Sequence, residues 1–395
     1  ALEELVKKLP GAEIDDEGKI TINGKEVTKI MIDGKEFFMD DPNIALKNLP
    51  VNIIDKVRAY DKESDMAKAT GIKDGEEETV LDLSVKPGMN KGWFGNVDVA
   101  GGTEDRYSGK LLLNRFNGAN KFTVIGSSNN VNDNGFPGGG GGGGWRRSNG
   151  LNTIHMGGFN FITETKKWKN NGSVDFNLKN SDVRAKKASE TFVSNDVSSF
   201  TNSINSDNNR DLNFRANFRI EWNPDTTTMV LFRPKFSLGD TDYQSGSKTY
   251  TFNQDPMYST DELVGTDDIT TLVPEENIIN SIIRNNLSRS NSLSYGASLL
   301  FNKRLGKPGR NITFWGSFNY TDSQAEQFSE SETNYFQKTE EEQLEILNRY
   351  ISTPSESYNY SARLSYSEPI FRNMFLQFSY NFQFKRNTSD NSTFD

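Results

Sequence analysis

The feature that most constrains this chain is a strict alternation of apolar and polar residues in segments of about ten residues. A segment in which apolar and polar side chains alternate with a period of two residues forms a β-strand with one apolar and one solvated face. In the clearest segment the apolar positions are Leu212, Phe214, Ala216, Phe218, Ile220 and Trp222. The same pattern recurs at 230–238, 293–301, 312–320, 358–366 and 376–384, and it is noisier between residues 93 and 129. Tilted strands of about 9–11 residues are long enough to cross a bilayer, so the pattern favours a transmembrane β-barrel over a β-sandwich.

The spacing between these segments supplies an independent test. Short connections are expected at 117–120, 165–168, 223–226, 306–309 and 368–373. Long ones are expected at 130–149, 185–208, 240–290 and 321–356. Outer-membrane barrels alternate short periplasmic turns with long extracellular loops, whereas a sandwich has no reason to do so. We therefore predict a mostly β fold with about eleven antiparallel strands, which as an odd number leaves the barrel unclosed.

Composition divides the chain in two. Only Phe37, Phe38 and Tyr60 of the 45 aromatic residues (27 Phe, 13 Tyr, 5 Trp) lie before residue 91. The first 90 residues also carry 13 basic and 20 acidic residues, a net of −7 out of −9 for the chain. We predict a small α+β domain at residues 1–88 and the barrel at 89–395. Within the first domain we expect short helices at 2–9 and 51–57, a hairpin around Asn23-Gly24 and a strand at 79–85.

Several classes of protein are excluded by rare residue types. The chain has no cysteine and one histidine, which excludes disulfide scaffolds, thiol enzymes and Cys-ligated metal sites. The acidic balance argues against a nucleic-acid partner. His155 has no recognisable catalytic partner motif. We expect no enzymatic activity, no catalytic residue, no metal and no cofactor.

Two sets of residues are candidate site residues. The polar faces of the strands would put Asn213, Arg215, Asn217, Arg219, Glu221 and Arg363 in the barrel lumen. There they could line a polar path or hydrogen-bond a domain that fills the lumen, and the sequence leaves both open. Trp145, Arg146 and Arg147 follow seven glycines in a predicted flexible extracellular loop and are candidate ligand contacts. Residues 277–285 and 340–351 show helical spacing and are expected to form short helices in extracellular loops.

The N-terminal segments resemble a known family. The stretches LVKKLPG (5–11), DDEGKITING (15–24), KIMIDGKEFF (29–38) and NLPVNIIDKVRAYD (48–61) resemble the plug domain of TonB-dependent outer-membrane transporters. The following KGWFGNVDVAGGTEDR (91–106) resembles the start of the barrel in an outer-membrane β-barrel branch related to SusC-like porins. The resemblance covers essentially the whole chain.

This resemblance implies a 22-stranded barrel in the outer membrane of a Gram-negative bacterium, blocked by a plug and energised by the TonB complex. We expect this chain to hold the plug and the first half of such a barrel, because about half the strands, a TonB box and a C-terminal aromatic residue are missing. The implied function is active uptake of an unidentified ligand, with membrane lipids and a surface lipoprotein as candidate partners. The alternative is a non-transporting adhesin or structural subunit of a surface complex.

Overall fold

The computed structural model describes residues 5–15, 19–37, 49, 51–133, 150–194, 197–339, 341–371 and 374–394. Its main feature is one antiparallel sheet in which β8 to β18 pair in chain order, with β19 beside β17 past the end of β18. The strands are β8 Lys91–Gly101, β9 Tyr107–Asn117, β10 Asn120–Asn129, β11 Leu151–Glu164, β12 Trp168–Ser194, β13 Val197–Asp225, β14 Thr228–Phe252, β15 Ile278–Arg304, β16 Asn311–Tyr335, β17 Leu344–Phe371, β18 Met374–Ser389 and β19 Ser392–Phe394. The predicted fold class and the count of eleven main strands are confirmed. Within the described residues the sheet is open, with edges at β8 and at β18 and β19.

The connections follow the predicted alternation at one end of the sheet only. Short connections lie where they were predicted, after β9, β11, β13, β15 and β17. The prediction of long loops at the other end is wrong for most of 185–208 and 321–356 and for about half of 240–290, because strands continue through them. Most of the loop predicted at 130–149 lies outside the described residues. β12 and β13 contain 27 and 29 residues and remain paired almost to residues 195–196. At about 3.3 Å per residue such a strand is roughly 90 Å long, so most of it extends beyond a bilayer.

The apolar outer residues of these strands form a continuous surface, here called the apolar belt. It covers residues 212–222 of β13, 230–238 of β14, 293–301 of β15, 312–320 of β16, 358–366 of β17 and 376–384 of β18. The belt residues farthest from the short turns are Leu212, then Leu238 and Leu293, then Tyr320 and Tyr358, then Phe384. Leu238 pairs with Phe214, Tyr320 with Tyr295, and Phe384 with Tyr360, so the edge moves by two residues every two strands. With spacings of about 3.3 Å along and 4.8 Å between strands, this corresponds to a tilt of about 35° and a belt about 24 Å high. Both values fit an outer-membrane barrel wall.

The N-terminal region, residues 5–85, folds into two small sheets. The first contains β1 (Ala12–Ile14), β2 (Ile20–Ile22) and β3 (Lys25–Glu26), and the second is ordered β5 (Lys35–Glu36), β4 (Lys29–Ile32), β7 (Glu78–Val85), β6 (Ile54–Lys62). The predicted turn at Asn23-Gly24 is confirmed, with φ of 51° and 77°, the left-handed values of a tight hairpin turn. The predicted strand at 79–85 is also confirmed. The helix predicted at 51–57 is wrong: η1 (Val51–Ile53) is one short turn, and the chain then pairs as β6 with β7.

One helix of this region, α3 (Asp65–Thr70), is defined by its ends. Ser64 Oγ accepts a hydrogen bond from the Ala67 N–H at 2.9 Å, and Gly71 closes the helix with a φ of 74°. These caps satisfy backbone groups that so short a helix cannot pair internally. The caps therefore fix where the side chains of Asp65 and Lys68 lie.

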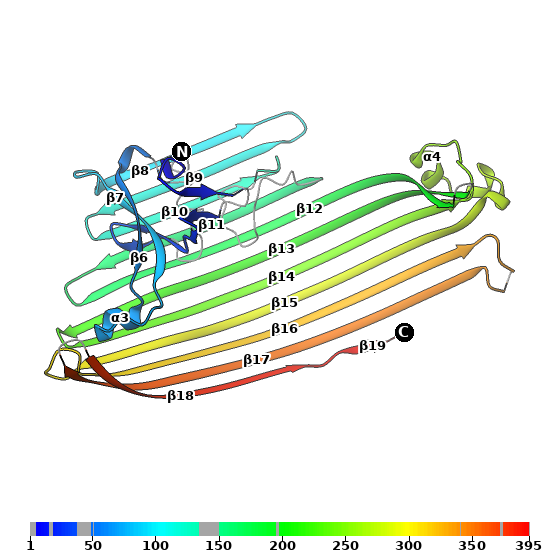
Figure 1. Ribbon diagram of the computed structural model, residues 1–395. Coiled ribbons are helices and arrows are strands. Elements are labelled where there is room, and N and C mark those ends of the chain that lie inside the picture. Colours follow the sequence, from blue (N-terminus) through cyan, green and yellow to red (C-terminus); the bar gives the residue numbers. More distant parts are fainter. Residues whose placement is uncertain are drawn as a thin grey trace.

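The N-terminal region packs against one face of the large sheet, at the end that carries the short turns (Figure 1). We call this the inner face. Its apolar core continues into the sheet, where Leu112, Phe116, Ile125, Met156 and Ile162 are buried against it. Because Leu111, Leu113 and Val124 are exposed on the opposite face, β9 and β10 are apolar on both sides. This explains why their alternation is noisy in the sequence.

At the far end of the sheet, the connection from β14 to β15 folds into α4 (Thr260–Gly265), η2 (Ile269–Thr271) and η3 (Glu275–Asn277). A second apolar cluster there includes Phe252, Leu263 and Ile278. The helices predicted at 277–285 and 340–351 are wrong, since β15 and β17 run through them. Paired isoleucines suggest helical spacing, but Ile278 is buried beside its strand partner Phe252. Among the described residues, no helix has the length and apolarity needed to span a membrane.

Candidate functional site

The candidate site is the contact between the N-terminal region and the inner face. One cross-strand row of the sheet contributes a contact from each of five strands. The row is Phe116, Lys121, Ile162, Asn171 and Arg219, on β9 to β13. Phe116 and Ile162 join the apolar core, and the other three reach polar groups of the N-terminal region. The chemistry of the contact thus changes along the row: the apolar contacts at β9 and β11 flank the Lys121 ion pair at β10, and the row becomes polar at β12 and ionic at β13.

The ionic end is centred on Asp65 of α3. Arg219 donates to both of its carboxylate oxygens, from Nη1 at 2.8 Å and from Nη2 at 2.9 Å. Arg233 on β14 forms a second ion pair with the same carboxylate. The Arg219 side chain is 10% exposed, so this bidentate pair is largely removed from water. Bidentate guanidinium–carboxylate contacts of this kind combine strength with a fixed geometry.

Glu221 extends the network to a second residue of α3. Its carboxylate accepts from Arg219 Nη2 at 2.8 Å and from Lys68 Nζ at 3.1 Å. Asn223 Nδ2 donates to it as well, at 3.1 Å. The carboxylate therefore joins α3 to the short-turn end of β13.

Glu36 of β5 is another carboxylate of the N-terminal region that faces the basic residues of the sheet, and it is buried. It pairs with Lys62 at 2.9 Å and with Lys29 at 3.6 Å, while Arg233 lies at 4.0 Å. Burial alone would raise the pKa of Glu36, but Lys62, Lys29 and Arg219 outweigh it and hold the pKa at about 2. Burial opposes ionisation of Asp65 too, and Arg219 and Arg233 keep its pKa well below the usual value. Both groups are therefore charged at neutral pH.

The backbone carbonyls at the carboxyl end of α3 accept hydrogen bonds from side chains of the sheet. Arg304 of β15 donates to the carbonyls of Lys68 and Ala69, both at 3.3 Å, and Asn311 of β16 donates to that of Thr70 at 3.3 Å. Helix-end carbonyls have no partner inside the helix, so the sheet supplies the missing donors. Beneath these bonds a small apolar cluster joins Ala69 to Met229, Leu231 and Leu300.

On the opposite flank, the β4–β5 hairpin contacts β10 and β11. Lys121, 2% exposed, forms an ion pair with Asp33 in the hairpin turn, and Lys35 pairs with Glu164. The turn requires a left-handed backbone at Asp33 and Gly34, with φ of 51° and 77°. Gly34 N–H donates to Asp82 of β7 at 2.8 Å, which ties the turn to the sheet behind it.

The predicted lumen residues all lie on the inner face, but they have different contacts. Arg219 and Glu221 reach the N-terminal region as described above. Arg363 is in the same inner row as Glu221 and donates to Asn381 of β18 at 2.5 Å. Asn213, Arg215 and Asn217 lie on this face farther along β13. The structure thus brings two of the six residues to the N-terminal region and places the other four elsewhere on the inner face of the sheet.

Sequence reasoning missed several residues of the network. Arg233 and Lys235 occupy the polar positions of the alternating segment 230–238, so the rule that identified Arg219 would have found Arg233. Asp65 and Glu36 carry no comparable signal, because the partner of Asp65 is 154 residues away in the chain. Burial of such a carboxylate is visible only in the folded protein.

The remaining candidates give no second site. Trp145, Arg146 and Arg147 lie outside the described residues. His155 is in the outer row of Leu178, and its Nδ1 is 2.8 Å from Ser128 Oγ. In the part of the chain that the structure describes, no group of three or more His, Cys, Asp or Glu side chains could hold a metal ion.

The pKa of Glu36 predicts an acid-sensitive contact. A carboxyl whose folded pKa lies near 2 stabilises the fold fully above its unfolded value of 4.5, and this contribution is lost as the pH falls through 4.5 toward 2. The contribution is on the order of 2–3 kcal/mol. Thermal unfolding of the N-terminal region between pH 7 and 3 should show the loss in wild type and a flatter profile in Glu36→Gln. Identical profiles would contradict the prediction.

Comparisons with known proteins concern the fold only. No protein-family model matches the sequence, and no curated protein does either. Among solved structures, the ferric yersiniabactin uptake receptor FyuA from Yersinia pestis is 12% identical with a TM-score of 0.24, and the match covers 99% of this chain and 66% of that one. The copper transporter OprC is 8% identical (TM-score 0.23, 98% and 76% covered), and the ferripyoverdine receptor of the outer membrane of Pseudomonas aeruginosa is 10% identical (TM-score 0.23, 98% and 68% covered). The chain thus spans less than two thirds of FyuA. At these identities and TM-scores, nothing that those proteins bind is transferred to this chain.

Proposed function

We propose that this chain contributes the plug and part of the wall of an outer-membrane uptake protein of the TonB-dependent kind, related to SusC-like porins. The observation that carries the proposal is the pairing of two surfaces on one sheet. The outer face carries an apolar belt about 24 Å high, which fits the hydrocarbon layer of an outer membrane. The inner face holds the N-terminal region through a shared apolar core and through ion pairs, of which Asp65–Arg219 is largely buried. A membrane wall that holds a folded domain on its inner side is suited to a gated passage.

In this proposal the N-terminal region is the plug, and transport requires no covalent chemistry. A ligand enters from the side of the extended strands, and energised displacement of the plug opens the path. Such displacement would first have to separate Asp65 from Arg219 and Lys68 from Glu221. Ion pairs suit a reversible contact, because water and counterions can solvate both partners once they part. The TonB complex would supply the energy, and a surface lipoprotein remains a candidate partner.

The test uses the full-length protein. We expect it to fractionate with the outer membrane and to migrate as a heat-modifiable band in gel electrophoresis. When inserted into planar bilayers, it should not conduct ions. A variant lacking residues 1–88 should fold into the same membranes and conduct ions. Recovery in the soluble fraction, or equal conductance with and without residues 1–88, would contradict the proposal. Uptake that persists without the TonB complex would instead favour the non-transporting surface protein with the same fold.

A further inference from the structure

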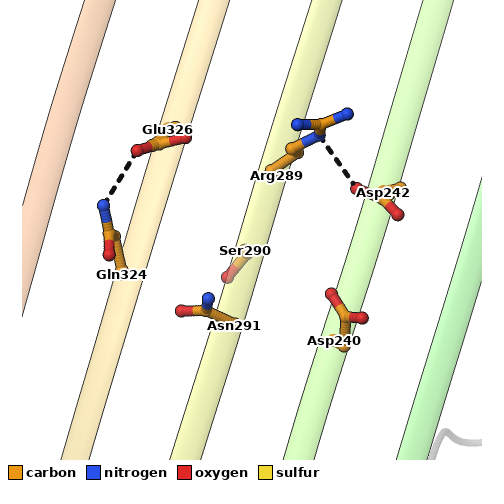
Figure 2. A pocket seen from close by; sticks show the side chains of 7 residues that line it. All are labelled: Asp240, Asp242, Arg289, Ser290, Asn291, Gln324 and Glu326. Atoms are coloured by element: carbon orange, nitrogen blue, oxygen red, sulfur yellow. Dashed lines mark hydrogen bonds and ion pairs between the residues drawn. The ribbon is translucent and has the colours of Figure 1, made fainter.

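A group of planar polar side chains lies on the outer face just past the edge of the apolar belt. On β14 and β15 the belt ends at the pair Leu238 and Leu293. The next outer row is Asp240, Asn291 and Gln324, and the one after it is Asp242, Arg289 and Glu326. Figure 2 shows these six side chains around one hollow, with Ser290 between the rows. We call the six the polar grid.

Its height relative to the belt places it at a membrane surface. With a tilt of about 35°, the first row lies about 5 Å and the second about 11 Å beyond the belt edge on β14 and β15. The polar layer of a leaflet is about 5–8 Å thick. This assignment rests on the proposed outer-membrane location. Given that location, the first row is at the level of the headgroups of the outer leaflet, and the second row lies just beyond them, where a sugar headgroup extends.

The chemistry of the grid selects among headgroups. Three carboxylates and two amides supply many acceptors, against the guanidinium of Arg289 and that of the neighbouring Arg210, 3.5 Å from Asp242 and 3.9 Å from Asp240. A bare phosphate brings only acceptors and leaves the carboxylate and amide oxygens of the grid without donors. A sugar brings several hydroxyl donors together with acceptors, and so can satisfy both kinds of group. We propose that the polar grid binds the sugar headgroup of an outer-leaflet glycolipid.

Arg289 is the group with donors to spare. Its Nε is 3.3 Å from Asp242 Oδ1, and its side chain is 65% exposed. Among the described residues no hydrogen bond from its Nη groups is seen, so these can donate to a ligand. Gln324 donates to Glu326 at 2.8 Å, which orients both side chains. Arg210 and Asp242, 3.5 Å apart, continue the second row onto β13. The same row could instead be a ladder of ion pairs that only stabilises the strands, and the test separates the two roles.

The test uses the full-length protein in nanodiscs of phosphatidylethanolamine and phosphatidylglycerol, with lipopolysaccharide added as the probe. The variant Asn291→Ala combined with Arg289→Gln removes donors and acceptors of the grid. It should weaken lipopolysaccharide binding about tenfold, the effect of losing one or two hydrogen bonds. The matched control is Asn285→Ala, on the same face of the same strand but six residues farther from the membrane. It should bind as wild type does.

The outcomes are distinct. Equal lipopolysaccharide binding in wild type and the double variant overturns the inference. It is also overturned if the wild-type protein binds lipopolysaccharide no more tightly than it binds the phospholipids of the nanodisc. If wild type enters membranes and stays closed to ions in either case, the proposed function stands and only the glycolipid site fails. If the protein does not enter membranes at all, both fail. A loss of thermal stability in the double variant without loss of binding assigns the row to ion pairing alone and also overturns the inference.

Discussion

Asp65→Ala is expected to release α3 from the sheet. The substitution leaves the guanidinium groups of Arg219 and Arg233 without the carboxylate that both contact. Removing one member of a largely buried ion pair costs about 3 kcal/mol, because the remaining charge stays poorly solvated. Hydrogen exchange of the backbone amides in α3 should therefore become about a hundredfold faster. Exchange across the apolar contact with β9–β11 should change much less.

The matched control is Asp61→Ala. Asp61 is also an aspartate of the N-terminal region, and it pairs with Lys25 at 2.5 Å, but both side chains are substantially exposed. Exposed pairs contribute little to stability, so exchange in α3 should stay at the wild-type rate. Equal acceleration by both substitutions would show that α3 is not held by the Arg219 contact.

Leu299→Arg is expected to destabilise the sheet in a membrane, whereas Leu287→Arg is not. Both leucines lie on the outer face of β15, Leu299 within the apolar belt and Leu287 six residues past its edge at Leu293. Arginine near the middle of a bilayer costs about 2–4 kcal/mol in a barrel wall, and about 0–1 kcal/mol near the interface. Denaturant titration of the protein folded in lipid vesicles measures both costs. Similar costs for the two substitutions would place the membrane elsewhere on the sheet.

The alternation in the sequence was enough to predict the strands, their two faces and the short turns. Leu212 to Trp222 shows why: successive side chains lie on the outer and the inner face of the sheet in turn, so the pattern records the two environments directly. The extension at 185–208 was missed because both of its faces are mostly polar, whereas those at 278–285 and 344–351 were missed because their apolar residues suggest helical spacing. Residues 185–208 resemble a loop in composition, yet Ala185 pairs with Asn205 because a neighbouring strand satisfies its backbone.

The site was predicted in part for a related reason. Arg219 and Glu221 interrupt no pattern and were identified as inner residues by their positions alone. Their partners Asp65 and Lys68 lie on a six-residue helix whose sequence is not distinctive. The contact depends on how the N-terminal region and the large sheet meet, and a local pattern carries no information about that.

The long polar extensions also determine how the strands find their register. A slip by one residue exchanges the two faces of a strand, which is costly in the belt but nearly free where both faces carry serine, threonine and asparagine. Register in the extensions must therefore be set by the apolar belt, where Trp168 stacks on Trp222 at 5.5 Å beside a short turn. Strand pairing would then form first in the apolar belt and propagate from there toward the far ends of the extensions. An insertion within the belt would shift every pair beyond it, whereas one near residues 195–196 would be absorbed locally.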